Sequence, residues 1–309
     1  MTGSAGFLGY HVCEALLERG HEVDGVDAFT DFYDPSIKRA NAAQLGGHDG
    51  FRGVELDLAR ADLDDVLTGA DAVIHLAAQP GVRLSWSDGF AVYVERNITA
   101  SQRLLEAARR TRLPRLVLAS SSSVYGNAIE QSITEGASTL PFSPYGVTKL
   151  AMEHLASVYG ANWGLSTVVL RYFTVYGPGQ RPDMALHRFI AAVAAGRPLT
   201  VYGDGEQVRD FTYVSDAAAA TLAAADADVP PAAVFNVAGG SPATVNDLLR
   251  LVSEHVGRPP ITRHVADQAG DVRVTRGAID RARRVLGWRP EVPLHDGVKR
   301  QVVYQLGGR

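Results

Sequence analysis

The sequence predicts an α/β fold built on a doubly wound parallel sheet, together with a smaller α/β lobe. Short β-like runs alternate with helical patterns through the first half of the chain, which is the order that βα units produce. These runs are apolar at nearly every position, as in strands covered by helices on both faces. A glycine-rich segment also opens the first helical pattern.

The elements of the first half follow from these patterns in order. We expect strands at Glu22–Val26, Phe51–Leu56, Ala72–Ala77, Leu116–Ser120 and Thr167–Phe173. We expect helices at Phe7–Arg19, Leu63–Leu67, Val92–Arg110 and Tyr145–Tyr159. In the first helix, Leu8, Val12 and Leu16 recur at helical spacing, and Gly20 follows as a stop signal.

The pattern changes after residue 174. The segment Val175–Asp183 holds two prolines and two glycines, which predicts a long loop. We then expect helices at Met184–Ala195, Ala217–Ala225 and Ala278–Val285, and strands at Leu199–Tyr202, Phe211–Val214, Val234–Ala238 and Ile261–Val265. A further helix begins at Thr244, because Asp247 three residues later completes a capping box. We assign 1–174 plus 211–238 to the sheet domain and 175–210 plus 239–309 to the smaller lobe.

Composition excludes several classes of protein. Charged residues make up 21% of the 309 residues and the formal net charge is −4, which argues against disorder and against a nucleic-acid binder. No run of about 18 apolar residues predicts a membrane helix. The single cysteine, Cys13, excludes a disulfide scaffold, and the nine histidines show no metal-ligand spacing. We therefore expect no metal site. No basic leader precedes an apolar stretch, so we expect a cytoplasmic protein.

The glycine-rich segment predicts a dinucleotide site. Gly3, Gly6 and Gly9 precede and open a helix, where small residues let the backbone approach a pyrophosphate and the helix N-terminus offers free N–H groups. Asp27 follows the next strand, where a carboxylate accepts hydrogen bonds from the ribose hydroxyls of NAD and repels the 2′-phosphate of NADP. NAD is therefore the expected cofactor.

The strand that ordinarily precedes this glycine pattern is missing or nearly so. Only Met1 stands before Thr2. A central strand is not dispensable in a doubly wound sheet, so we expect the residues of that strand to lie upstream of this sequence.

A catalytic group is indicated by Tyr145 and Lys149, which share one face of a helix at i and i+4. A free tyrosine has a pKa near 10, so a phenolate at neutral pH needs about 4 kcal/mol of stabilisation, which a nearby cation supplies in part. Such a pair is common by chance. The serines Ser120–Ser123 strengthen the prediction of a catalytic group, because they follow a predicted strand and ligands bind at the carboxyl ends of strands in such sheets.

These features together resemble the extended short-chain dehydrogenases/reductases that modify nucleotide sugars, over essentially the whole chain. The shared motifs are His75–Gln79 (HLAAQ), Ser120–Gly126 (SSSSVYG), Arg171–Pro178 (RYFTVYGP), Arg209–Val214 (RDFTYV) and Leu286–Pro290 (LGWRP). Three stretches look most like the UDP-glucuronate 4-epimerases: Asp31–Asp34 with Lys38, Gln79–Ser85 and Phe173–Met184. One departure is Ser4, where the family usually has another glycine.

The resemblance implies roles for individual residues. Ser121 is the catalytic hydroxyl, Tyr145 the base, and Lys149 its partner, which also holds the nicotinamide ribose. The cofactor-binding positions are Gly3, Gly6, Phe7, Leu8, Gly9, Asp27, Asp57, Leu58, Ala77, Ala78, Gln79, Asn97, Tyr145, Lys149 and Tyr172. Arg209 and Arg273 are similar to the family's diphosphate clamps, and the uridine lies along Leu199–Tyr202, including Val201 and Tyr202. In the family, two helices of each subunit form a four-helix bundle, so a homodimer is expected.

The resemblance therefore implies an NAD-dependent 4-epimerase of a UDP-sugar, with UDP-glucuronate favoured. Epimerases of UDP-glucose or UDP-N-acetylglucosamine and a UDP-glucuronate decarboxylase remain alternatives. A 4,6-dehydratase is disfavoured, since Ser122 and Ser123 stand where that family has an acid pair. A non-catalytic NAD-sensing protein predicts a broken Ser/Tyr/Lys set, whereas all three residues are present.

A UDP-glucuronate epimerase must also bind the sugar carboxylate. The candidate groups are the hydroxyls of Ser122, Ser123 and Thr174 and the guanidinium of Arg181, with Arg83 a weaker candidate. The alternative for Arg181, in a proline-rich loop, is plain contact with solvent.

Overall fold

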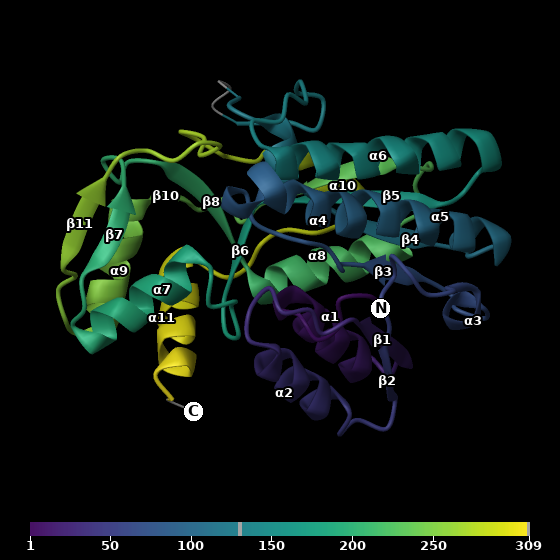
Figure 1. The fold of residues 1–309 in the computed structure, drawn as a ribbon, viewed down its shortest axis with the longest axis horizontal. Helices are drawn as coiled ribbons and strands as arrows, with labels where there is room; N and C mark the ends of the chain where they lie inside the picture. Colours follow the sequence, from purple (N-terminus) through teal and green to yellow (C-terminus); the bar gives the residue numbers. More distant parts are fainter. Residues whose placement is uncertain (129–131, 308–309) are drawn as a thin grey trace.

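The structure is a computed structural model that describes residues 1–128 and 132–307. Its main sheet is parallel throughout and confirms the predicted fold class. The strands of this sheet are β1 (Val23–Asp27), β2 (Phe51–Glu55), β3 (Val73–His75), β4 (Leu116–Ser121), β5 (Thr167–Tyr172) and β9 (Ala233–Val237). Their order is β2-β1 on one side and β3-β4-β5-β9 on the other, and the two parts meet at the N-terminus (Figure 1).

Met1 and Thr2 join the two parts of the sheet. Thr2 bridges Val26 and His75 in parallel, its N–H donates to the Ile74 carbonyl at 2.9 Å, and the Val26 N–H donates to the Met1 carbonyl at 2.7 Å. The Thr2 hydroxyl lies 2.8 Å from His75 Nδ1. Burial lowers the pKa of His75 to about 3, so this ring is neutral and structural. Met1 and Thr2 thus stand at the position of the central strand, which was predicted to be missing or nearly so.

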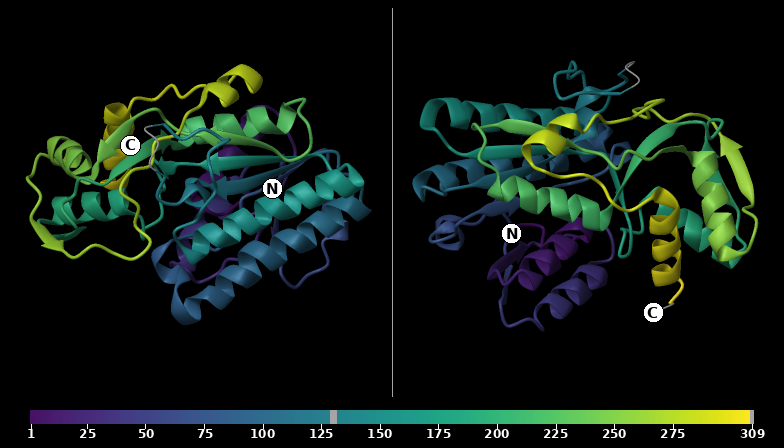
Figure 2. Two further views of the ribbon diagram at one scale, coloured as in Figure 1. Left: turned by 90° about the horizontal axis from the view of Figure 1, so that it is seen from above. Right: turned by 180° about the vertical axis from the view of Figure 1, so that it is seen from behind.

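Helices cover both faces of the main sheet (Figures 1 and 2). On one face α1 (Phe7–Glu18) packs against α8 (Val214–Asp226), and on the other α5 (Ala100–Arg110) packs against α6 (Pro144–Trp163). Each face has its own apolar core of valines, leucines and alanines. Local signals mark both ends of α6. Ser143 accepts a hydrogen bond from the Gly146 N–H, Pro144 begins the first turn, and Gly164 ends the helix in a left-handed conformation.

The predicted helix Val92–Arg110 is interrupted. The segment begins as α4 (Phe90–Tyr93), continues as the π-helical η3 (Val94–Thr99) and ends as α5. The wider turn places the buried Asn97 so that its side chain accepts from the Gln79 N–H at 2.7 Å and donates to the Gln79 carbonyl at 3.0 Å. Such a turn was not predicted, because π-helical turns are rare single turns that no residue type marks.

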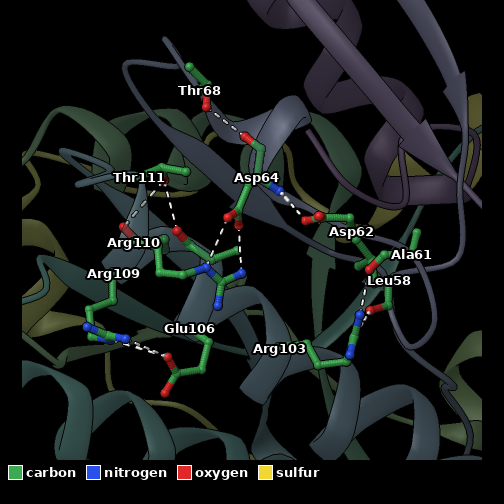
Figure 3. A network of polar contacts seen from close by, with 12 residues as sticks. Leu58, Ala61, Asp62, Asp64, Thr68, Arg103, Glu106, Arg109, Arg110 and Thr111 are labelled. Carbon is green, nitrogen blue, oxygen red and sulfur yellow. Dashed lines mark hydrogen bonds and ion pairs between the residues drawn. The ribbon is translucent and has the colours of Figure 1, made fainter.

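Two helices border the loops of β1 and β2. Helix α2 (Pro35–Leu45) was not predicted, although Asp34 caps it and Pro35 begins its first turn; α3 (Asp64–Leu67) was predicted. Figure 3 shows how α5 holds the loop before α3: Arg103 donates to the carbonyls of Leu58 at 3.2 Å and Ala61 at 2.6 Å. Arg110 pairs with Asp64 at 2.6 Å in the same network.

The rest of the chain forms a second apolar core beside the carboxyl ends of the main strands (Figure 2). Its elements are β6 (Thr174–Tyr176), α7 (Ala185–Ala195), β7 (Leu199–Tyr202), β8 (Val208–Tyr213), β10 (Pro242–Thr244), α9 (Val245–Val256), β11 (Thr262–Val265) and α11 (Leu294–Gln305), with α10 (Asp280–Val285) against β9. The strands form two small sheets, β10-β8-β6 and β11-β7. The capping box of Thr244 and Asp247 is present, whereas β6, β10 and α11 were not predicted.

Short 3-10 turns complete the path of the chain at η1 (Arg83–Ser85), η2 (Ser87–Gly89) and η4 (Ser122–Tyr125). Within the described residues, every helix is too short or too polar to cross a bilayer.

Candidate active site

A cavity of about 470 Å³ lies at the carboxyl ends of the main strands, where the second core meets the sheet. The sequence-predicted residues that line it are Gly3, Gly6, Phe7, Leu8, Gly9, Asp27, Asp57, Leu58, Ala77, Ala78, Gln79, Ser121, Ser122, Ser123, Tyr145, Lys149, Tyr172, Thr174, Arg181 and Arg209. The fold therefore brings most of the predicted cofactor, catalytic and carboxylate-binding positions into one space, as the topology of a doubly wound sheet requires.

The glycines leave no room for side chains. A Cβ on Gly9 would lie 1.9 Å from the Gly3 carbonyl oxygen, and one on Gly3 would lie 2.7 Å from the Ala77 nitrogen. Gly3 also has a φ of +69°, which favours glycine. This close approach exposes the N-terminal turn of α1 to the cavity, a geometry that suits the pyrophosphate of a dinucleotide.

Asp27 ends β1 at the edge of this glycine cradle and is held in place by the backbone. Its carboxylate accepts from the N–H groups of Ala5 at 3.2 Å and Phe29 at 2.8 Å. The buried Lys38 ammonium lies 4.0 Å from Asp27 Oδ1 and donates to Thr30. The carboxylate thus faces the cavity in a fixed orientation, as recognition of ribose hydroxyls requires.

The predicted catalytic residues meet at the end of β4. The Lys149 ammonium donates to the Ala119 carbonyl at 2.8 Å, and burial lowers its pKa to about 8. Desolvation raises the pKa of Tyr145, while a hydrogen bond with Ser121 and the charge of Arg181 oppose the rise. Without a bound cation the phenol is therefore protonated at neutral pH, and a positive charge beside it favours the phenolate.

The candidate carboxylate site lies beside this group. Ser122, Ser123, Thr174 and Arg181 line the same cavity, and Ser121 and Ser123 exchange a hydrogen bond at 3.1 Å. Arg181 is 20% exposed and forms a bidentate pair with Asp183 at 2.9 and 3.0 Å. Its guanidinium stands in the cavity wall rather than in open solvent.

Other predicted positions lie outside the described lining of the cavity: Arg83, Asn97, Val201, Tyr202 and Arg273. Asn97 instead holds the backbone of Gln79. Val201 is buried in the second core, and Arg83 stacks over the Tyr202 ring at 4.1 Å.

The two arginines expected to clamp a diphosphate have different surroundings. Arg209 lines the cavity and pairs with Asp271 at 3.3 Å, and Asp271 also pairs with Arg83 at 3.3 Å. Arg273 pairs with Asp204 at 2.7 Å on the exposed surface. Only Val272 separates Asp271 from Arg273 in the chain, yet Asp271 lines the cavity and Arg273 lies outside its described lining.

Several lining residues were not predicted as site residues: Thr30, Phe32, Tyr33, Lys38, Arg96, Phe142, Ser143, Met184, Gly270, Asp271, Val272 and Thr275. For Phe32, Tyr33 and Lys38 a signal existed in the segment that carries the family resemblance. Residues 270–275 come from the segment between β11 and α10, and only the tertiary fold brings that segment over the cavity.

A doubly wound sheet, a glycine-lined dinucleotide cradle and a serine, tyrosine and lysine at the strand ends together define the class of short-chain dehydrogenases/reductases. Residues 1–238 match the model of the NAD dependent epimerase/dehydratase family, and the chain belongs to that family.

Relatives support this assignment. The chain is 42% identical over 306 residues to the Bacillus subtilis (strain 168) protein named uncharacterized UDP-glucose epimerase YtcB, covering 98% of this chain and 96% of that one. It is 36% identical to the UDP-glucuronate 4-epimerase of Thermodesulfobacterium geofontis (strain OPF15), covering 98% and 94%. The Bacillus cereus UDP-glucuronic acid 4-epimerase, solved with UDP-glucuronic acid and NAD, superposes with a TM-score of 0.96 at 39% identity, covering 99% and 98%.

The fixed carboxylate of Asp27 predicts a cofactor preference. We expect the protein to bind NAD at least about tenfold more tightly than NADP, because a 2′-phosphate would stand against this carboxylate. Asp27→Asn should narrow the difference. Isothermal titration calorimetry measures both affinities, and Asp24→Asn on the same strand, where Asp24 pairs with Arg52 at 2.6 Å, is the matched control. Equal affinities of the unchanged protein for the two cofactors would contradict the assignment.

Proposed function

We propose that this protein is an NAD-dependent 4-epimerase of a UDP-sugar that converts UDP-glucuronate to UDP-galacturonate. The observation that carries the proposal is the grouping of Ser121, Tyr145 and Lys149 at the end of β4, with Arg181 close enough for its charge to act on Tyr145. Family membership and the UDP-glucuronate epimerases among the relatives support it.

The chain's own residues perform the proton chemistry. Tyr145 takes the proton of the sugar's 4-hydroxyl and later returns it, while Ser121 orients that hydroxyl. The Lys149 ammonium, anchored on the Ala119 carbonyl, favours the phenolate. Bound at this site, NAD would supply a hydride acceptor and donor for carbon 4, so the reaction would have no net redox change. The glycine cradle, Asp27 and the wall formed by Ala77, Ala78 and Gln79 fit that cofactor.

Incubation with UDP-glucuronate and separation of the products test the proposal. UDP-galacturonate as the main product supports it. UDP-xylose or its 4-keto precursor as the main product would make the protein a decarboxylase. Epimerisation of UDP-glucose as fast as UDP-glucuronate would favour the activity that the name of the Bacillus subtilis relative suggests.

We further propose a division of labour between the two parts of the chain. Residues 1–174 plus 211–238 bind NAD, and residues 175–210 plus 239–309 bind the nucleotide sugar. The main sheet and the second apolar core support this division, although β8 pairs with β6 and β10 rather than with the main sheet.

A cytoplasmic location is part of the proposal, since the single cysteine, Cys13, is buried and unpaired.

We also propose a homodimer in which α5 and α6 of two subunits form a four-helix bundle. Val147 and Val158, eleven residues apart on one face of α6, are 48% and 50% exposed. Val147→Glu combined with Val158→Glu should therefore convert a dimer to a monomer in light scattering after size exclusion. Val303→Glu on α11, where the side chain is 44% exposed, is the control and should stay dimeric. A monomeric unchanged protein at micromolar concentration would contradict the proposal.

A further inference from the structure

One stripe of α6 contacts the end of β4 at three successive residues. Tyr145, Lys149 and Glu153 recur every four residues, so they share one side of the helix. The Ser121 hydroxyl lies near enough to Tyr145 to lower its pKa, Lys149 donates to the Ala119 carbonyl, and Glu153 accepts from the Ser120 hydroxyl. The first two residues already have roles in the proposed reaction, whereas Glu153 has none.

Glu153 is a buried carboxylate, 6% exposed, held by a buried guanidinium. Arg171 donates to its two oxygens, at 2.6 Å to Oε2 and 2.9 Å to Oε1. Arg171 on β5 is the register partner of Ser120 on β4, so neighbouring strands present the two donors to one carboxylate. Removing one partner of such a buried pair is costly, which argues that the arrangement is tightly constrained.

The pair is anchored on its far side as well. Arg171 donates to the Tyr125 hydroxyl at 2.9 Å, and that hydroxyl donates to Asn236 at 2.7 Å. The Asn236 amide, fully buried on β9, donates to the carbonyls of Ile133 and Ala278. Glu153 is therefore linked through Arg171 to β5 and, through Tyr125 and Asn236, to β9.

We propose that Glu153 is a positioning residue, which fixes α6 against the end of β4 through Ser120 and thereby sets the approach of the Tyr145 and Ser121 hydroxyls. Successive strand residues point to opposite sides, so a fixed Ser120 also fixes the direction of Ser121. The inference rests on the proposed function, since it names a further residue for the same proton transfer.

The charge of Glu153 acts in the same direction. Burial lowers the pKa of Lys149, and the Glu153 carboxylate opposes that effect. Without it, Lys149 and Arg171 would be cations without this shared counter-ion, and Lys149 would lose its proton at a lower pH. The groups that surround Tyr145 and Lys149 are Ser121 on β4, Tyr93 on α4, Arg181 before α7, His75 on β3, and the ion pair of Glu153 and Arg171.

The test compares two changes in the NAD-loaded protein. Ser120→Ala removes the link to β4 and keeps the ion pair, and Glu153→Gln also removes the charge. Both should lower kcat by about tenfold with KM for the UDP-sugar nearly unchanged, because a small misplacement affects the reacting geometry more than binding. Glu153→Gln should lower the pKa of Tyr145, because it removes a negative charge and Lys149 has already lost its proton at the pH where Tyr145 ionises; Ser120→Ala keeps the charge and should leave that pKa nearly unchanged. Tyrosinate absorbance, measured against the same protein carrying Tyr145→Phe, reports that pKa without any substrate.

Tyr125→Phe is the matched control, because it removes a hydrogen bond from the far side of Arg171. It should lower thermal stability without changing kcat or the Tyr145 titration. Folded Ser120→Ala and Glu153→Gln proteins with wild-type kcat and Tyr145 titration would overturn the inference, as would an equal loss of kcat in Tyr125→Phe. If the unchanged protein epimerises no UDP-sugar, the proposed function fails, and the titration of Tyr145 alone decides the role of Glu153.

Discussion

Tyr145→Phe should lower turnover by about 10²- to 10⁴-fold while NAD binding stays nearly intact. The substitution keeps the ring, which packs edge-on against Tyr93 at 6.2 Å between centroids, and removes only the proton acceptor. Ser121 and Lys149 remain, but neither replaces a phenolate that must accept and return the proton of the 4-hydroxyl. Steady-state kinetics on UDP-glucuronate and calorimetry with NAD measure the two effects separately.

Lys149→Met is the informative companion change. It removes the cation that favours the phenolate and the donor expected to hold the nicotinamide ribose, so both turnover and NAD affinity should fall. A Tyr145→Phe protein that keeps more than a few percent of the activity would show that another group is the base. Equal NAD affinity in Lys149→Met and the unchanged protein would separate Lys149 from the cofactor.

The fold was predictable because its signals are local. Buried parallel strands are apolar at nearly every position, and residues such as Ser143 and Thr244 mark helix starts within a few residues. Strands β6 and β10 were missed because each is three residues long and stands next to prolines and glycines, β6 before Gly177 and Pro178 and β10 at Pro242. Helix α2 carries the capping signal of Asp34, but only two of its residues are buried, so it lacks an apolar stripe.

The cofactor side of the cavity was predictable for a related reason. Gly3, Gly9 and Asp27 act through steric fit and charge at positions that the sequence spacing determines. The residues expected to bind the sugar come from distant segments, and their partners decide where they point. Asp271 pairs with Arg209 and Arg83 at the cavity, whereas Asp204 draws Arg273 to the surface. Charge type alone does not tell which arginine faces the cavity.

The carboxylate of UDP-glucuronate makes a specific demand on this cavity. Once carbon 4 is a ketone, the sugar is a β-keto acid, and carbon dioxide leaves when the bond to the carboxylate stands roughly perpendicular to the carbonyl plane. An epimerase must hold that bond away from this angle. Thr174 and Ser122 offer hydroxyls for this purpose, and Arg181 offers a charge. In the structure the Arg181 guanidinium pairs with Asp183, so the substrate carboxylate competes with the Asp183 carboxylate for Arg181.

Arg181→Ala should therefore weaken affinity or rate for UDP-glucuronate by about 10- to 100-fold, since a charge-assisted hydrogen bond contributes roughly 1.5–3 kcal/mol. UDP-glucose, which has no carboxylate, should be affected much less. Arg188→Ala, at an exposed position on α7 outside the described cavity lining, is the matched control. Asp183→Asn should not weaken the binding of UDP-glucuronate, because it frees the guanidinium of Arg181. The ratio of kcat/KM for the two sugars measures the effect. An unchanged ratio in Arg181→Ala would remove this arginine from carboxylate recognition and leave the hydroxyls of Ser122, Ser123 and Thr174 to perform it.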